Sequence, residues 1–227
     1  MGECIKFGKG KLQIFDDVFK NNSWEMIIAA CQRNCVPDTW KVGDQKTMAI
    51  NGADYAIDII GKNHDTYSDG SGTAPLTFQM HDCYLPRVPE MHSSGDATWD
   101  SCEMRTVTLP SLLQTMPVEV QNAVKEVNKS AFSGNGTSVA VSVDKVFLLS
   151  RVEIFGDEIG AYTGEGSQYE YYALGNSKVK TRSGEAELWW TRSRCTYATA
   201  FWTVNRSGEA ETNGTTGAAA IAFAFCF

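Results

Sequence analysis

The chain has 227 residues, of which 43% are hydrophobic, and a formal net charge of -7 at pH 7. This length and composition are typical of one globular domain and exclude collagen, coiled coils and bulk disorder. The acidic balance disfavours nucleic acid and anionic membrane surfaces as partners, because both attract clustered Lys and Arg.

The beginning of the sequence resembles neither a leader nor a membrane anchor. Residues 1–20 lack a basic start followed by an apolar stretch, and no apolar run in the sequence is long enough to span a bilayer. We therefore expect no signal peptide, no transmembrane segment and no membrane insertion. We also expect an N-terminal extension over residues 1–21 and a single domain over residues 22–227.

The first half of the sequence predicts a helix followed by a hairpin. Apolar residues share one face of a helix over residues 23–35, and Asn22 with Glu25 suggests a capping box at its start. Asn51-Gly52 predicts a tight turn between strands at 46–50 and 53–60, because both turn positions of such hairpins favour positive φ.

Further along the chain, helical patterns give way to strands. Residues 101–129 predict helices interrupted by Pro110 and Pro117, with Val127 on the apolar face of the last helix. We expect strands at 76–85, 145–155, 187–192, 198–204 and 219–227, and a long polar loop at 156–184. This order predicts an α+β fold without the strand–helix alternation of parallel α/β proteins.

The cysteines favour buried thiols over a framework of disulfides. Their number is odd and their spacing is irregular, which fits neither paired bridges nor a zinc motif. The seven residues are Cys4, Cys31, Cys35, Cys83, Cys102, Cys195 and Cys226.

The segment at 194–217 has the composition of a recognition surface. It mixes Tyr, Trp, Phe and Arg with Ser, Thr, Asn and Gly. Paratopes use these residue types because rigid aromatic side chains give contact area at low entropic cost and small polar ones adapt their hydrogen bonds. The alternative is a set of Thr- and Gly-rich turns without a binding role.

A family resemblance rests on the C-terminal third. ELWWTRS at 187–193 is followed by FWTV at 201–204, then Gly208, then the apolar tail AFAFCF at 222–227. This arrangement resembles a domain family of unknown function found in bacterial and phage proteins. That family looks like a member of the C-type lectin fold, which the variable proteins of diversity-generating retroelements share with the formylglycine-generating enzymes.

The resemblance extends over about residues 22–227. Its upstream segments are WKVGD at 40–44, IIGKNHD at 59–65, FQMHDC at 78–83, MRT at 104–106 and DKVFLLS at 144–150. It implies two helices packed on a small, mostly antiparallel twisted sheet with long loops. Two local departures are Arg194, where many relatives have Pro, and the absence of a G-V-R-P-type ending.

The resemblance also implies which residues bind a ligand. Trp189, Trp190, Arg192 and Ser193 would form a scaffold in a variable region at about 187–227. The ligand-binding positions would be Arg194, Thr196, Tyr197, Thr199, Phe201, Trp202, Asn205, Arg206, Glu209, Glu211, Asn213, Thr215 and Thr216.

From these features we expect a phage- or prophage-encoded recognition protein that is not an enzyme and needs no cofactor or metal. It would bind a protein or glycan on a cell surface, and would itself lie on a virion or a cell surface within a larger assembly. The alternatives are a structural virion or tail module that binds no ligand, and an enzyme of the formylglycine-generating type.

Catalytic and metal motifs are weak. His64, His81 and His92 lack the spacing of a zinc-protease motif. Cys195 and Cys226 are the only cysteines in the C-terminal half, and their surroundings do not resemble the reactive pair of the formylglycine-generating enzymes. The acidic loop at 65–69 could bind calcium through carboxylate and hydroxyl oxygens, but a solvated loop is the favoured interpretation.

Overall fold

The main sheet has five antiparallel strands and takes strands from both ends of the chain. The computed structural model describes residues 15–86, 88–133, 138–156, 164–196 and 199–227. The strand order is β1-β2-β3-β12-β6. These strands span Gln45–Ile50, Ala53–Gly61, Thr77–Met80, Ala224–Cys226 and Val146–Phe147, respectively.

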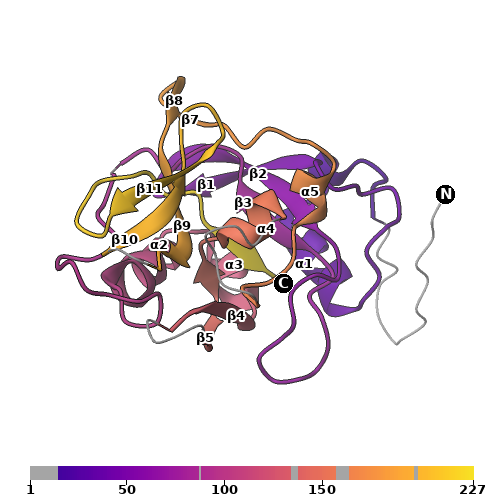
Figure 1. The fold of residues 1–227 in the computed structure, drawn as a ribbon. Helices are drawn as coiled ribbons and strands as arrows, with labels where there is room; N and C mark the ends of the chain where they lie inside the picture. Colours follow the sequence, from indigo (N-terminus) through magenta and orange to yellow (C-terminus); the bar gives the residue numbers. More distant parts are fainter. Residues whose placement is uncertain (1–14, 87, 134–137, 157–163, 197–198) are drawn as a thin grey trace.

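Three smaller antiparallel units surround this sheet (Figure 1). The three-stranded one has the order β11-β10-β9, with strands at Ala210–Gly214, Ala200–Val204 and Trp189–Arg194. The two hairpins are β4-β5, at Val127–Phe132 and Val139–Asp144, and β7-β8, at Lys180–Arg182 and Glu185–Glu187.

The helices are short and accompany the sheets. The α-helices α1 to α5 span Trp24–Gln32, Leu109–Leu113, Val118–Ala123, Arg151–Phe155 and Glu170–Ala173. A 3-10 turn, η1, covers Phe19–Asn21, and a π-helical turn, η2, covers Met104–Thr108. Within the described ranges, no helix has the length and apolar character needed to cross a membrane. Short helices together with antiparallel sheets confirm the α+β class predicted from the sequence.

The predicted hairpin is present in the predicted register. Ile50 pairs with Ala53 across the turn, and Asn51 and Gly52 have φ values of 51° and 76°. Asn and Gly tolerate this left-handed conformation, which matches the twist of the two flanking strands. The local sequence therefore predicts this corner of the main sheet correctly.

Helix α1 packs against the main sheet through its first residue, Trp24. The indole Nε1 of Trp24 donates to the carbonyl of Thr47 at 3.1 Å, and its ring meets Phe78 edge to face at 5.7 Å. The predicted Asn22–Glu25 capping box is wrong, because Ser23 is the N-cap and accepts from the Met26 amide. Asn22 instead donates to three carbonyls, including that of Asp16, and fixes the chain that enters the helix.

Part of the expected N-terminal extension belongs to the core. Phe15 and Phe19 meet the ring of Trp40 at 6.0 and 5.4 Å, and Phe19 also stacks on Phe78. Residues 1–14 of the expected extension lie outside the described residues.

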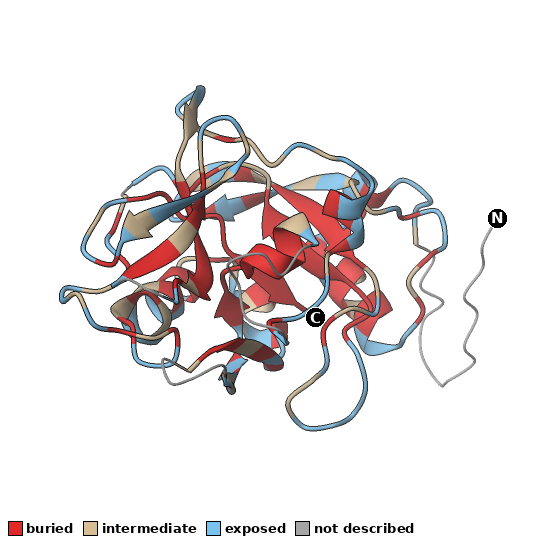
Figure 2. Ribbon diagram, viewed as in Figure 1, coloured by how far each residue is buried: buried red, intermediate tan, exposed pale blue. Residues whose placement is uncertain are grey.

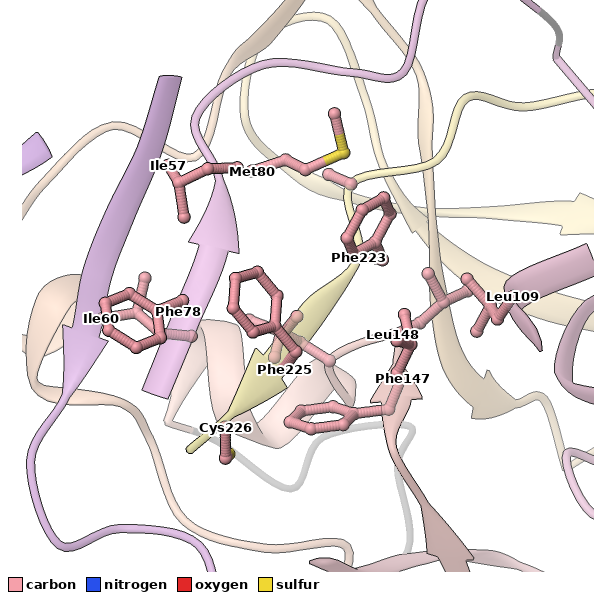
Figure 3. Packing of buried hydrophobic residues seen from close by; sticks show 14 of the residues in the cluster. Ile57, Ile60, Phe78, Met80, Leu109, Phe147, Leu148, Phe223, Phe225 and Cys226 are labelled. Atoms are coloured by element: carbon pink, nitrogen blue, oxygen red, sulfur yellow. The ribbon is translucent and has the colours of Figure 1, made fainter. Parts of the chain in front are cut away.

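The C-terminal tail runs through the middle of the core. All residues from 219 to 227 are buried, and β12 lies between β3 and β6. Figure 3 shows Phe223 and Phe225 of this tail among core residues from distant parts of the chain. Phe225 stacks on Phe78 at 5.4 Å. A buried aromatic residue such as these contributes about 3–5 kcal/mol, measured as the loss on truncation to Ala.

Two predictions are wrong: a helix that includes Val127, and a strand over residues 145–155. Val127 opens β4 rather than extending a helix, because α3 ends at Ala123 and Val124 is already extended. Residues 145–155 form the two-residue strand β6 and then helix α4. A complete capping box between Ser150 and Glu153 starts α4, and Gly156 at φ 74° ends it.

Three further predictions need smaller corrections. The strand expected at 76–85 is shorter, Thr77–Met80, and the expected loop at 156–184 contains α5 and β7. Pro110 does not break the helix, because the π-helical turn η2 runs directly into α2 and its wider hydrogen-bonding pattern lies just before the proline that lacks an N–H. The strand β11, at Ala210–Gly214, was missed.

Candidate binding surface

The WWTRS segment forms β9, a buried strand whose side chains are all anchored. Trp189 donates its indole N–H to the carbonyl of Lys178 at 3.1 Å. Trp190 donates its own to the carbonyl of Pro89 at 2.9 Å. Neither indole is exposed at all, so each combines a large packed surface with a satisfied donor.

Arg192 is the central anchor of this strand. Its guanidinium uses all five donors, three of which reach the backbone carbonyls of Ser130, Leu148 and Glu165. The other two form a fork on the carboxylate of Glu153. A planar guanidinium can satisfy such a set of acceptors and an ammonium cannot. One buried side chain thus ties β9 to three other segments.

The neighbouring hydroxyl groups complete the attachment of β9. Ser193 Oγ donates to the carboxylate of Glu165 and accepts from the amide of Arg151 at 2.8 Å. Thr191 Oγ1 donates to the carbonyl of Trp202 at 2.8 Å, at the irregularity in the β9–β10 pairing. The four residues expected to form a scaffold are therefore fully buried and hydrogen-bonded.

A cluster of buried charges lies behind Arg192. Lys129 Nζ reaches Asp65 at 2.8 Å and Glu153 at 2.6 Å, and Tyr169 donates to Asp65. Burial opposes ionisation of both carboxyls, but Lys129 lowers the pKa of Asp65 to about 2. Arg192 and Lys129 likewise hold the pKa of Glu153 below its ordinary value. Two cations and two carboxylates therefore balance one another in the interior.

Glu165 differs from these two carboxyls. Burial raises its pKa above the ordinary value, although hydrogen bonding to Ser193 and the charge of Arg192 oppose the shift. Its carboxyl also accepts from the amide of Phe132 at 3.0 Å. Glu165 consequently joins β4 to β9 through the hydrogen bonds that its two carboxyl oxygens accept.

Exposure rises across the small sheet from β9 to β11 (Figure 2). Strand β10 is intermediate: Phe201 and Thr203 are buried, whereas Trp202 is half-buried. The ring of Trp202 lies 4.8 Å from the guanidinium carbon of Arg151, within the range of a cation–π contact. Trp202 pairs with Thr212 of the exposed strand β11. The sheet thus offers an open edge beside a fixed interior.

Two groups of loops border this sheet at its opposite ends. At one end Arg194 binds Asp96 at 2.9 Å, and Gly95 of the same loop lies beside Thr199. At the other end Arg206 reaches Glu187 at 2.6 Å. We call β10, β11 and these loops the C-terminal surface; its described members span residues 194–196 and 199–217, with 95–96 beside them.

The structure divides the expected ligand-binding residues into several groups. Six are exposed: Thr196, Thr199, Arg206, Glu209, Glu211 and Thr216. Four are partly exposed: Arg194, Trp202, Asn205 and Asn213. Tyr197 lies outside the described residues.

Two of the expected ligand-binding residues are corrected. Phe201 is fully buried because it belongs to the core-facing side of β10, and Thr215 is 1% exposed because loop 91–92 covers it. The amides of Met91 and His92 both donate to the Thr215 carbonyl.

Two partly exposed asparagines have structural bonds. Asn205 accepts from the amides of Ser207 and Glu209 and so shapes its own turn. Asn213 donates to the carbonyl of Ala218 at 3.1 Å. The members with the greatest exposure are therefore the Thr, Glu and Arg side chains of the first group, and Trp202 is partly exposed beside them.

Sequence reasoning missed three neighbours of this surface. Thr212 alternates with Asn213 on β11, and the period of two in an extended strand could have indicated it. Asp96 and Arg151 come from distant segments, and nothing local in the sequence links them to β10.

The carboxylate of Asp65, considered above as a calcium ligand, binds other side chains of the protein. Asp65 is 3% exposed and already binds Lys129, Thr77 and Tyr169, so it is not a free ligand in an acidic loop. Within the ranges that the structure describes, no group of three or more His, Cys, Asp or Glu could hold a metal ion.

The described cysteines are six buried free thiols: Cys31, Cys35, Cys83, Cys102, Cys195 and Cys226. Burial raises the pKa of Cys195 to about 11 and that of Cys226 well above its ordinary value. Since the thiolate is the reactive form, both are poor nucleophiles. Cys4 lies outside the described residues.

Comparison with known proteins gives a family without an assigned activity. No curated protein and no solved structure matches the chain. A family model described as "Domain of unknown function (DUF6273)" matches residues 78–227. That match covers more than half of the chain and contains most of β3, Lys129 and Glu153 of the charged cluster, the WWTRS strand and the C-terminal surface. The chain therefore belongs to the DUF6273 family.

Proposed function

We propose that this protein is a recognition protein with a C-type lectin fold, which binds a protein or glycan on a cell surface through its C-terminal surface. The proposal includes a phage or prophage origin, the variable-protein type of diversity-generating retroelements, and a location on a virion or cell surface within a larger assembly. The chain's role in that assembly is binding rather than catalysis.

The observation that supports it most is the contrast between β9 and β11. Every polar side chain of the WWTRS segment is buried and bonded internally, whereas the residues of β11, the edge strand beyond β10, are exposed or partly exposed. Substitution in β9 would disturb several segments at once. Substitution of Glu211 or Thr212 would change only surface chemistry, which is the arrangement that a recognition surface needs.

The chemistry of the surface also fits recognition. A half-buried aromatic ring, Trp202, lies among short polar side chains and charged groups from two loop clusters. Trp and Arg are enriched among residues that dominate binding energy, and Ser, Thr and Asn provide adaptable hydrogen bonds. Packing of helices on an antiparallel sheet, with a second small sheet bearing WWTRS, supports the lectin-like part of the proposal.

The test is capture on arrays of glycans and of bacterial surface proteins. The test variants are Glu211→Lys and Thr216→Trp, and the matched control is Glu126→Lys, an exposed Glu just before β4. We expect both test variants to lose the wild-type signals and the control to keep them. All three should keep wild-type stability to within about 0.5 kcal/mol, as is usual for surface changes.

Two results count against the proposal. One is wild-type binding by both test variants. The other is the absence of any specific array signal together with a defect of particle assembly in the same variants, which would favour a purely structural module.

A further inference from the structure

A groove separate from the C-terminal surface lies between the end of α1 and the loop at 63–73. Its volume is about 570 Å³, within the usual range for small-molecule sites. In Figure 1 the loop projects beside α1, away from β10 and β11. Its floor is buried and apolar, and consists of Cys31, Pro75 and Phe227. The wall includes the half-buried ring of Tyr67.

The rim of the groove carries amides and hydroxyls without internal partners. The side chains of Gln32, Asn34, Asn63 and Thr73 line it and are exposed. Within the described part of the chain, none of these four side chains forms a hydrogen bond to the protein. An amide or hydroxyl group both donates and accepts. The rim can therefore match a ligand that presents many hydroxyl groups.

The loop that holds Asn63 and Thr73 is fixed through its backbone. Its amides at Tyr67, Ser68 and Ala74 donate to carbonyls at 2.8–2.9 Å, and that of Ser68 reaches across to Glu126. The hydroxyl of Tyr67 donates to the carbonyl of Phe227 at 2.7 Å, which orients its ring. A preorganised site avoids the entropic cost of ordering a loop on binding.

Two of the rim residues have an unusual backbone. Asn34 and Asn63 both have φ values of 50°, in the left-handed region. Asn tolerates this region better than other residues with a side chain, and Gly tolerates it best. This geometry provides conservative test variants, because Gly keeps the backbone and removes the amide.

We propose that this groove binds a hydroxyl-rich ligand of the size of a mono- or disaccharide. The apolar floor and the Tyr67 ring receive the C–H face of a sugar ring, and the rim amides and Thr73 bond its hydroxyls. Among the residues that the structure describes, the lining contains Lys125 and no Asp or Glu side chain. This inference is independent of the proposed function, since it involves none of the residues of the C-terminal surface.

The experiment uses the full chain labelled with ¹⁵N and a panel of glucose, galactose, mannose, N-acetylglucosamine and glucuronate. Amide shifts are followed as each sugar is added to millimolar concentrations. We expect at least one sugar to shift the amides of residues 31–34 and 63–73. Asn34→Gly and Asn63→Gly should each weaken this binding several-fold. Thr73→Trp, which fills the groove, should weaken it by about 10-fold or more, equal to about 1.4 kcal/mol.

The control is Thr216→Trp, the same substitution on the C-terminal surface, which should leave groove binding unchanged. The inference is overturned if no sugar in the panel shifts the groove amides. Shifts that persist in Thr73→Trp, or shifts that map to β10 and β11 and vanish in Thr216→Trp, would also overturn it. The last pattern would support the proposed function while excluding the groove, so failures of the two proposals are distinguishable.

Discussion

Replacement of Arg192 by Met tests whether the WWTRS strand is a structural anchor. The change removes five hydrogen bonds and leaves the buried carboxylate of Glu153 with Lys129 as its remaining cationic partner. Removing one partner of a buried ion pair typically costs about 3–5 kcal/mol. Each carbonyl left without a donor adds about 1–3 kcal/mol. The expected loss is therefore at least 3–5 kcal/mol, a large part of the stability of an ordinary domain.

The assay is urea denaturation followed by tryptophan fluorescence. The urea concentration at the unfolding midpoint should fall strongly. The slope of the unfolding free energy against urea concentration should stay the same. Arg206→Met is the matched control, because that Arg is exposed and forms a surface pair with Glu187; it should lose less than about 1 kcal/mol. If Arg192→Met does not fold, Arg192→Lys provides the measurement, since it keeps the charge but has too few donors for the five acceptors.

A second substitution tests the electrostatic part of this argument. Glu153→Gln added to Arg192→Met removes the uncompensated carboxylate, so the double variant should lose less stability than the sum of the two single variants. The reasoning is refuted by a loss below about 1 kcal/mol for Arg192→Met, or by strict additivity in the double variant.

Three further outcomes are expected. Hydrogen bonding to Asp58 raises the pKa of His81 in the folded protein. The resulting stabilisation is fully present below the ordinary His pKa and is lost as pH rises through the raised pKa. His81→Gln should therefore reduce the fall in stability as pH rises above the ordinary His pKa, and an NMR titration of His81 should give the raised pKa directly. Trp190→Phe should lose about 0.5–1.5 kcal/mol from its hydrogen bond, because the carbonyl of Pro89 loses the indole donor and keeps only the amide of Ala219 at 3.3 Å, and thermal unfolding measures the loss. Cys195 should react with a thiol reagent only after unfolding, because it is buried and its pKa is raised to about 11; rapid labelling of the native protein would contradict this.

The sequence predicted the elements that short-range signals determine. The Asn51-Gly52 turn, the helix near residue 24 and the strands at 189 and 200 depend on local periodicity and turn chemistry, and all are present. The prediction of a strand at 145–155 failed because a short apolar run suits a buried strand and a buried helix equally. The capping signal of Ser150 with Glu153 could have resolved it.

The interior of the candidate site could not be predicted in the same way. Lys129 was assigned to a helical region, yet it lies in β4 and balances Asp65 and Glu153, which are far away in the sequence. Ion pairs between residues far apart in the sequence produce no periodic pattern in that sequence. On the surface, the composition of 194–217 located the candidate region, but only the strand pairing distinguishes buried Phe201 from half-buried Trp202.

The central claim is that a fixed interior supports a surface whose side chains can change freely. The most direct measurement is protease resistance and ligand selection in two displayed libraries. The first randomises Thr199, Glu209, Glu211 and Thr216, and the second randomises Trp189, Trp190, Arg192 and Ser193. We predict that most members of the first library stay folded and that it yields binders to an arbitrary protein target, whereas most members of the second unfold. Equal loss of folding in both libraries, or a folded first library that yields no binder, would contradict the account.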